Sequence, residues 1–146
     1  MSETELTGEE TARLREALAR VPFAHLLGLE LVGAWRGAAT LSVELRDDLK
    51  RNGGLMHGGA MASLMDSASA FAVMTLLAPG EQTVTVDLQI HFLRPVFAGR
   101  LEARARVLRK GRRVATLTID VTDEAGKLTA TGTTTYLIQS AAPDSS

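Results

Sequence analysis

Apolar and polar positions along the chain follow two different periods, and their order predicts the elements of the fold. Up to about residue 20, apolar side chains recur at helical spacing behind Thr7 and Glu10, which have the spacing of a capping box. Pro22 ends this helix, and residues 23–28 are expected to form a short turn. Two alternating segments follow, with a tight-hairpin signal between them, and they predict strands at residues 29–35 and 38–45.

The second half of the chain begins with a long apolar run and continues with alternating segments. Residues 57–78 are apolar nearly all round, which predicts a helix that is covered on most sides. In residues 83–93, valine, leucine and isoleucine alternate with polar side chains, as in a strand. Three further strands are expected, at residues 100–109, 114–122 and 127–138.

This order of elements predicts an α+β fold in which an antiparallel β-sheet is wrapped around one long central helix. The chain of 146 residues contains no linker that would divide it. We expect a single domain over residues 9–138, with disordered tails at residues 1–8 and 139–146.

Composition narrows the classes of function. The net charge of −1 gives no general attraction to nucleic acid or to an anionic membrane. The absence of cysteine excludes disulfides, thiolate metal sites and a cysteine nucleophile, and it fits a cytoplasmic protein. No His, Asp and Glu set has metal-ligand spacing, so neither a metal nor a redox cofactor is expected.

The start of the long helix carries the candidate chemistry. Gly58 and Gly59 follow His57 and leave backbone N–H groups uncovered where the helix dipole is positive, which suits a developing oxyanion. Asp66 is a lone carboxylate within the apolar run, and such a group is costly to bury without a partner or a function. Together these features suggest acyl transfer in which the carboxylate drives the attack.

Helix geometry constrains how these groups can cooperate. Gly59 and Asp66 lie on one side of the helix but roughly 10 Å apart along its axis. A carbonyl carbon must be about 3 Å from the attacking atom while its oxygen meets the N–H group, so one helix is unsuited to both tasks. Two antiparallel helices across a two-fold axis meet the requirement, and we therefore predict an obligate homodimer with two shared sites.

Several motifs resemble those of the PaaI-type branch of the hotdog-fold acyl-CoA thioesterases. The resemblance covers about residues 20–138, and its most specific part is a His-Gly-Gly whose His57 lies nine residues before Asp66. The segments that carry it are residues 54–59, 64–68, 84–95, 110–112 and 126–136. It implies a hotdog fold, thioester hydrolysis, and a dimer that commonly doubles to a homotetramer.

The resemblance also implies roles for individual residues. The N–H of Gly59 or Gly58 polarises the thioester carbonyl, and Asp66 acts as general base or as nucleophile. His57 shapes the helix start, and Thr85 lies where some relatives carry a hydroxyl that holds the attacking water. Relatives commonly have an asparagine six residues before the histidine; here that position is Arg51, and Asn52 follows it.

A basic cluster between residues 94 and 113 has two interpretations. It is either a solvated strand face or a docking edge for the phosphates of coenzyme A, which arginine and lysine suit well. The resemblance favours coenzyme A contacts from four of its members, Arg94, Arg109, Lys110 and Arg112. Coenzyme A would be part of the substrate, and no separate cofactor is expected.

Two other functions remain open at this point. A hydratase or dehydratase of the same fold would use a histidine with an acidic residue for proton transfer on the acyl chain, although the Gly-Gly opening and the His57–Asp66 spacing fit thioesterases better. A non-catalytic acyl-CoA binding module would keep the glycines and the basic edge without depending on Asp66. The sequence does not identify the acyl group.

Overall fold

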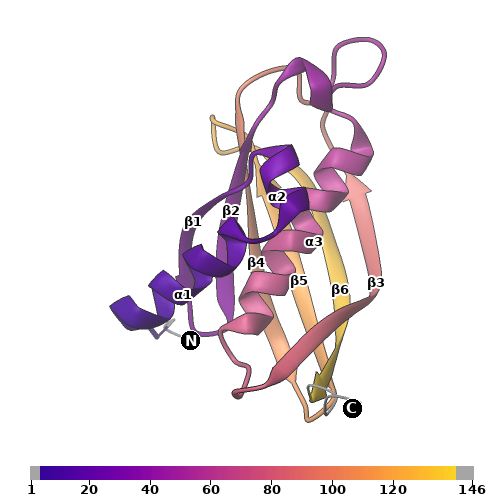
Figure 1. The fold of residues 1–146 in the computed structure, drawn as a ribbon. Coiled ribbons are helices and arrows are strands. Elements are labelled where there is room, and N and C mark those ends of the chain that lie inside the picture. Colours follow the sequence, from indigo (N-terminus) through magenta and orange to yellow (C-terminus); the bar gives the residue numbers. More distant parts are fainter. Residues whose placement is uncertain (1–3, 141–146) are drawn as a thin grey trace, which may run out of the picture.

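The computed structural model describes residues 4–140, and these form one antiparallel sheet around a central helix. The sheet order is β1-β2-β4-β5-β6-β3, and every neighbouring pair is antiparallel. The strands are β1 (Glu30–Trp35), β2 (Ala38–Glu44), β3 (Glu81–Phe92), β4 (Arg100–Lys110), β5 (Val114–Thr122) and β6 (Leu128–Ser140). The helix α3 (Gly58–Met74) lies across one face of this sheet, as Figure 1 shows. The predicted α+β class is confirmed.

The core lies between α3 and the sheet. Leu64, Met65 and Ala68 of α3 are fully buried, and so are the inward residues of the central strands, among them Leu101 and Leu117. These side chains are almost all aliphatic, in keeping with a chain that has only six aromatic residues. The buried face of α3 therefore fixes the helix against the sheet and leaves its other side for chemistry.

The N-terminal region closes the β1 edge of the sheet. The helix α1 (Gly8–Ala19) starts with the predicted capping box of Thr7 and Glu10. The segment expected as a turn after Pro22 is instead a short helix, α2 (Pro22–Leu27), with proline in its first turn and Gly28 at φ 75° behind it. Order also starts before the expected residue 9, because Glu5 pairs with Trp35, and β6 continues to Ser140. The outer parts of both expected tails, residues 1–3 and 141–146, lie outside the described residues.

The long helix ends earlier than the sequence suggests. It stops at Met74 rather than near residue 78. The next residue, Thr75, donates a hydrogen bond from its hydroxyl to the Ala72 carbonyl and accepts one from the Gly37 N–H. These bonds tie the helix end to the turn between β1 and β2. The loop between β2 and α3 contains a 3-10 turn, Asp47–Leu49, and then reverses at Gly53 and Gly54, whose φ angles of 94° and 86° favour glycine.

The edge strand β3 departs from strict alternation. A β-bulge lies between Thr85 and Asp87, so the side-chain phase changes there. Val84 and Val86 are half or more exposed, whereas Leu88 and Ile90 pack against the core. The bulge allows Thr85 to face the same side as Leu88, toward α3.

Candidate active site

Asp66 is half-buried on α3 and is held from two strands. The Thr85 hydroxyl of β3 donates to its Oδ1 atom over 2.9 Å, and the Tyr136 hydroxyl of β6 lies 2.5 Å from the same oxygen. Thr85 and Tyr136 are directly opposite each other in the β3–β6 ladder. The lone carboxylate of the apolar run therefore has two hydroxyl partners, and one of them, Thr85, was among the candidate site residues that the resemblance implied, there as a group that holds the attacking water.

Tyr136 is the site residue that sequence reasoning missed. Its side chain is only 2% exposed, and its hydroxyl also lies 2.7 Å from the Asp66 backbone carbonyl. Burial, together with the hydrogen bond to Asp66, raises the pKa of the Tyr136 phenol well above its usual range, so the group stays protonated. The available signal was that a buried tyrosine needs a hydrogen-bond partner, and this is the one tyrosine in the chain.

The N-terminus of α3 presents its N–H groups unequally. The Gly59 N–H donates to Nδ1 of His57 over 2.8 Å, so His57 acts as the N-cap of the helix. An accepting Nδ1 places the ring proton on Nε2. Among the described residues, the Gly58 N–H has no acceptor. Of the two predicted donors for an oxyanion, Gly58 is therefore the available one in this conformation, and Gly59 is engaged by His57.

A hollow of about 270 Å³ opens beside Gly58. Its wall includes Arg51 from the preceding loop, Met61 of α3, and Phe92 and Arg94 at the end of β3. A Cβ atom at Gly58 would lie 3.4 Å from the Phe92 ring, so this glycine keeps the hollow open. Arg51, at the position where the resemblance implied an asparagine, lines the hollow. Asn52 is exposed in the turn and is not part of the lining.

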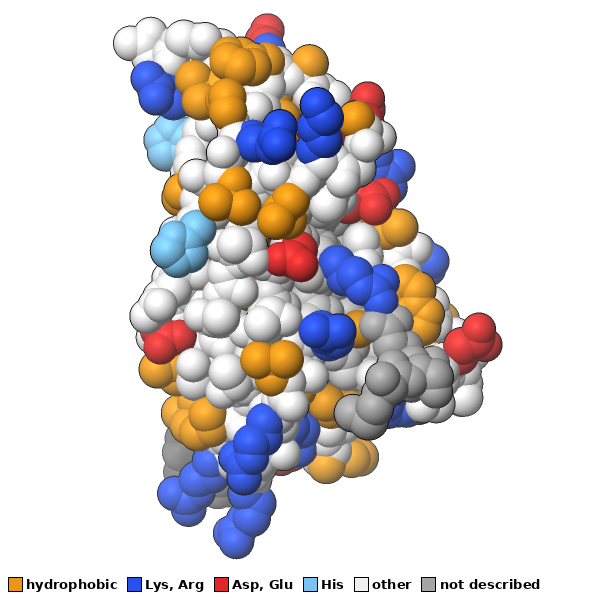
Figure 2. All heavy atoms as spheres, turned by 180° about the vertical axis from the view of Figure 1, so that it is seen from behind, with side chains coloured by type: hydrophobic (Ala, Val, Ile, Leu, Met, Phe, Trp, Pro, Cys, Tyr) orange, Lys and Arg blue, Asp and Glu red, His pale blue; other side chains and the backbone are white. Residues whose placement is uncertain are grey.

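The other predicted coenzyme A contacts lie at the opposite end of α3. Arg109 and Lys110 end β4, and Arg112 follows in the turn to β5, where all three are exposed. Val107 hydrogen bonds to Gly37, which is itself bonded to Thr75 just after α3, so this turn belongs to the C-terminal end of the helix. Figure 2 shows lysine and arginine side chains gathered at that end of the molecule. Within one chain, Arg94 and this basic turn therefore cannot contact the same part of a ligand.

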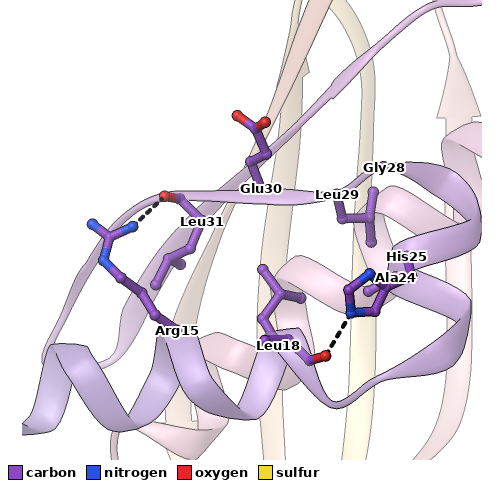
Figure 3. A pocket seen from close by; sticks show the side chains of 9 residues that line it. Arg15, Leu18, Ala24, His25, Gly28, Leu29, Glu30 and Leu31 are labelled. Carbon is purple, nitrogen blue, oxygen red and sulfur yellow. Dashed lines mark hydrogen bonds between the residues drawn. The ribbon is translucent and has the colours of Figure 1, made fainter.

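A larger hollow of about 450 Å³ lies away from these groups. It is open to solvent between α1, α2 and β1, and Leu18, Ala24 and Leu31 line it (Figure 3). The polar side chains at its rim, Arg15 and His25, hydrogen bond to the backbone carbonyls of Leu31 and Ala19. None of its lining residues comes from α3 or β3, so it is separate from Asp66.

Among residues 4–140, no three His, Asp or Glu side chains come together as a metal site requires. Within the same part of the chain, no helix is long and apolar enough to cross a membrane.

Comparison with known proteins gives the family. Residues 53–130 match the family model described as the thioesterase superfamily. Human acyl-coenzyme A thioesterase 13 is 32% identical over 84% of this chain and 91% of its own length. An Asn-to-Asp variant of the phenylacetic acid degradation protein PaaI from Thermus thermophilus is 36% identical, with a TM-score of 0.74 over 80% of this chain and 98% of that one.

A further solved structure supports the fold alone. A thioesterase from Haemophilus influenzae superposes over the whole of both chains with a TM-score of 0.86, at 21% identity. The family match covers the turn before α3, the helix with Asp66, and β3 with Thr85, and it ends at residue 130, before Tyr136. The chain belongs to the thioesterase superfamily, and its sheet and central helix form the hotdog fold of the PaaI-type members.

Proposed function

We propose that this chain hydrolyses acyl-CoA thioesters to a free acid and coenzyme A. The observation that carries the proposal is the Asp66 carboxylate, which is half-buried on α3 and accepts a hydrogen bond at Oδ1 from the Thr85 hydroxyl. Among the described residues, its Oδ2 takes no hydrogen bond, so this oxygen is available to a water molecule. The human relative that is named an acyl-coenzyme A thioesterase supports the choice of substrate class.

The complete site requires two chains. Eight residues separate Gly58 from Asp66, which is about 12 Å along an uninterrupted helix. An oxyanion donor and a base must act on one carbonyl group within about 3 Å, so the two groups of one chain serve different sites. We propose a homodimer in which the partner's helix runs antiparallel and brings its N-terminus to Asp66.

The edge strand β3 supports this arrangement. Within residues 4–140 no strand pairs with its outer side, and it exposes Val84 and Val86 by 50% and 60%, with Phe92 exposed by 56% at its end. An apolar, unpaired edge of this length favours pairing with another strand. Pairing of β3 with its two-fold copy would place the two helices side by side and antiparallel.

The chemical step follows from these positions. A water molecule loses a proton to Oδ2 of Asp66 while its oxygen forms a bond to the thioester carbon. The Gly58 N–H of the partner subunit, at the positive end of its helix, stabilises the negative charge on the carbonyl oxygen. The carbon–sulfur bond then breaks, and the coenzyme A thiolate takes up the proton that Asp66 had accepted. Direct attack by Asp66 would instead pass through an anhydride that water hydrolyses.

The basic residues are proposed as contacts for coenzyme A. In an antiparallel dimer, the turn with Arg109, Lys110 and Arg112 of one chain approaches the helix N-terminus and Arg94 of the other. The two groups of cations that lie apart in one chain would then bind the phosphates of one substrate. We further propose a tetramer of two such dimers, a cytoplasmic location and no cofactor, since no step above needs one.

The test is thiol release from a panel of aromatic and aliphatic acyl-CoAs, read with a thiol-reactive dye. The chain has no cysteine, so the protein gives no background signal. We expect turnover on one substrate class, and a loss of about 10²- to 10⁴-fold in Asp66→Asn. Asp120→Asn is the matched control, because Asp120 also accepts a hydrogen bond from a threonine hydroxyl, that of Thr131, but lies on β5 and has no hydrogen bond to Asp66.

The result also separates the alternatives. An Asp66→Asn protein with full activity would contradict the proposal. Substrate binding without turnover in the wild type would favour a non-catalytic acyl-CoA binding module.

A further inference from the structure

The Asp66 carboxylate is restrained from β6 as well as from β3. Tyr136 is the one ionisable side chain in hydrogen-bond contact with Asp66 in the described part of the chain. Its ring is buried in the core, and its hydroxyl reaches Asp66 on the helix. The contact joins the last strand of the chain to the middle of α3.

The hydroxyl has one proton and two neighbouring acceptor oxygens. The Asp66 backbone carbonyl lies 2.7 Å away and Oδ1 lies 2.5 Å away. The backbone carbonyl, in the interior of α3, also accepts a helix hydrogen bond. Oδ1 belongs to a charged carboxylate, and charge-assisted O–H···O⁻ bonds are the stronger kind. The phenol proton therefore goes to the carboxylate.

Two donors on one carboxylate oxygen leave the other oxygen for chemistry. Thr85 and Tyr136 approach Oδ1 from adjacent strands, and their own positions are fixed because they face each other in the β-ladder. Rotation of the carboxylate would break both bonds. The carboxylate is thus held in an orientation in which Oδ2 accepts no hydrogen bond from the described residues.

We propose that Tyr136 is a positioning residue for thioester hydrolysis, which fixes the Asp66 carboxylate so that Oδ2 faces the attacking water. This inference rests on the proposed function. It adds a residue that acts through Asp66 and does not itself touch the substrate. The competing explanation is purely structural: the hydroxyl would satisfy its own hydrogen bond with the backbone carbonyl and only stabilise the packing of α3 on β6.

The first test is Tyr136→Phe, which keeps the buried ring and removes the hydroxyl. We expect kcat to fall about 10- to 100-fold, because a hydrogen bond to a charged group is lost, with KM within about twofold. The acid limb of the pH–rate profile should move to higher pH, because the ionised carboxylate loses a donor. Thr134→Val is the matched control, since its buried hydroxyl bonds to the Asp87 carbonyl from the same strand and does not touch Asp66.

A second variant covers the case in which Tyr136→Phe fails to fold. The chain has a single tyrosine, so growth on 3-fluorotyrosine labels this position alone. The fluorinated phenol is a stronger donor of nearly the same size, and it should move the acid limb to lower pH, opposite to phenylalanine. The ¹⁹F resonance should shift in Asp66→Asn and stay in place in Asp120→Asn.

The outcomes are distinct. A wild-type kcat and an unchanged pH profile in both tyrosine variants would overturn the proposal. Equal losses of activity and thermal stability in Tyr136→Phe and Thr134→Val would also overturn it, in favour of the structural role. An inactive wild type would mean instead that the proposed function has failed, which the acyl-CoA panel detects independently.

Discussion

The two edges of the sheet differ, because the described chain covers the edge at β1 and leaves the edge at β3 uncovered. At β1, the chain covers its own edge: Glu5 pairs with Trp35, the Thr4 carbonyl accepts the Arg36 N–H, and the Arg15 guanidinium bonds to the Leu31 carbonyl. At β3, no segment of the described chain pairs with the outer side of the strand, although Val84 and Val86 are exposed there. An uncovered apolar edge is a liability that proteins usually block.

The difference indicates that the β1 edge serves the fold of the single chain, whereas the β3 edge serves the candidate site. The covered edge carries no residue of the candidate site, whereas the open edge carries Thr85 and leads to Arg94. We infer that the β3 edge stays open because a second copy of the chain must pair there. In the proposed dimer, pairing at the β1 edge would complete no site.

The most severe test of this comparison is to introduce charged side chains on the open β3 edge. Val84→Lys combined with Val86→Lys should prevent strand pairing and give a monomer, with kcat/KM reduced about 100-fold or more, because the partner's oxyanion donor is lost. Lysine is chosen since it does not repel the anionic substrate. Sedimentation velocity and thiol release measure the two effects.

The closed edge supplies the control for that variant. Val32→Lys places one such charge on β1, where Val32 is 40% exposed, and should leave both assembly and activity unchanged. A fully active monomer of the double-lysine variant would refute the shared site.

A complementation experiment sharpens the comparison further. Asp66→Asn and Gly58→Val each inactivate both sites of their own homodimers, the second by filling the hollow beside Phe92. Random mixing makes about half the dimers hybrid, each with one intact site, so co-expression should restore about a quarter of wild-type activity. Thiol release on the purified mixture measures the recovery.

The control is a pair of variants on the same half of the site. Asp66 and Thr85 are bonded within one chain. Co-expression of Asp66→Asn with Thr85→Val should therefore restore nothing. Equal recovery from both mixtures would show that the sites are not divided between chains as proposed.

The attachment of the open edge to the sheet depends on a glycine. A Cβ atom at Gly132 of β6 would lie 2.4 Å from the Gln89 carbonyl oxygen on β3 and 3.1 Å from Cε of Met65. Gly132→Ala should therefore lower the free energy of unfolding by about 1–3 kcal/mol. Denaturant titration measures it, with Gly8→Ala as the control, because nothing lies within 4 Å of the added atom there. Equal stability of the two variants would contradict the tight β3–β6 contact.

The sequence predicted the elements well because most of them follow simple periods. In strands such as residues 114–122, apolar and polar side chains alternate regularly. The long apolar run that starts with Gly-Gly predicted α3. Short polar signals were less informative: the Pro22 segment was expected to be a turn, although proline in a first turn and a glycine after the end also favour a short helix.

The candidate site was only partly predictable, because two of its residues depend on how the strands of the sheet pair. Asp66, His57 and Gly58 belong to one helix, so their relation follows from helix geometry. Thr85 depends on the bulge that turns it toward α3, and strict alternation would have placed it opposite Leu88. The contact of Tyr136 with Asp66 depends on the β3–β6 register over a separation of 70 residues, which no local pattern encodes.

The smallest expected effect lies at the closed edge and depends on pH. The hydrogen-bonded Arg36 guanidinium, together with the Thr7 N–H, lowers the pKa of Glu10 from 4.5 to about 2. A lowered folded-state pKa means that the pair stabilises the fold above about pH 4.5, and that this contribution is lost as the pH falls toward 2. Both side chains are more than a third exposed, so the effect should be small and screened by salt.

Thermal melts of the wild type and of Glu10→Gln should differ at pH 6 and converge near pH 2. Thiol release at pH 7 should be the same for both, because this edge is remote from Asp66, and a loss of activity in Glu10→Gln would show that the two edges are coupled.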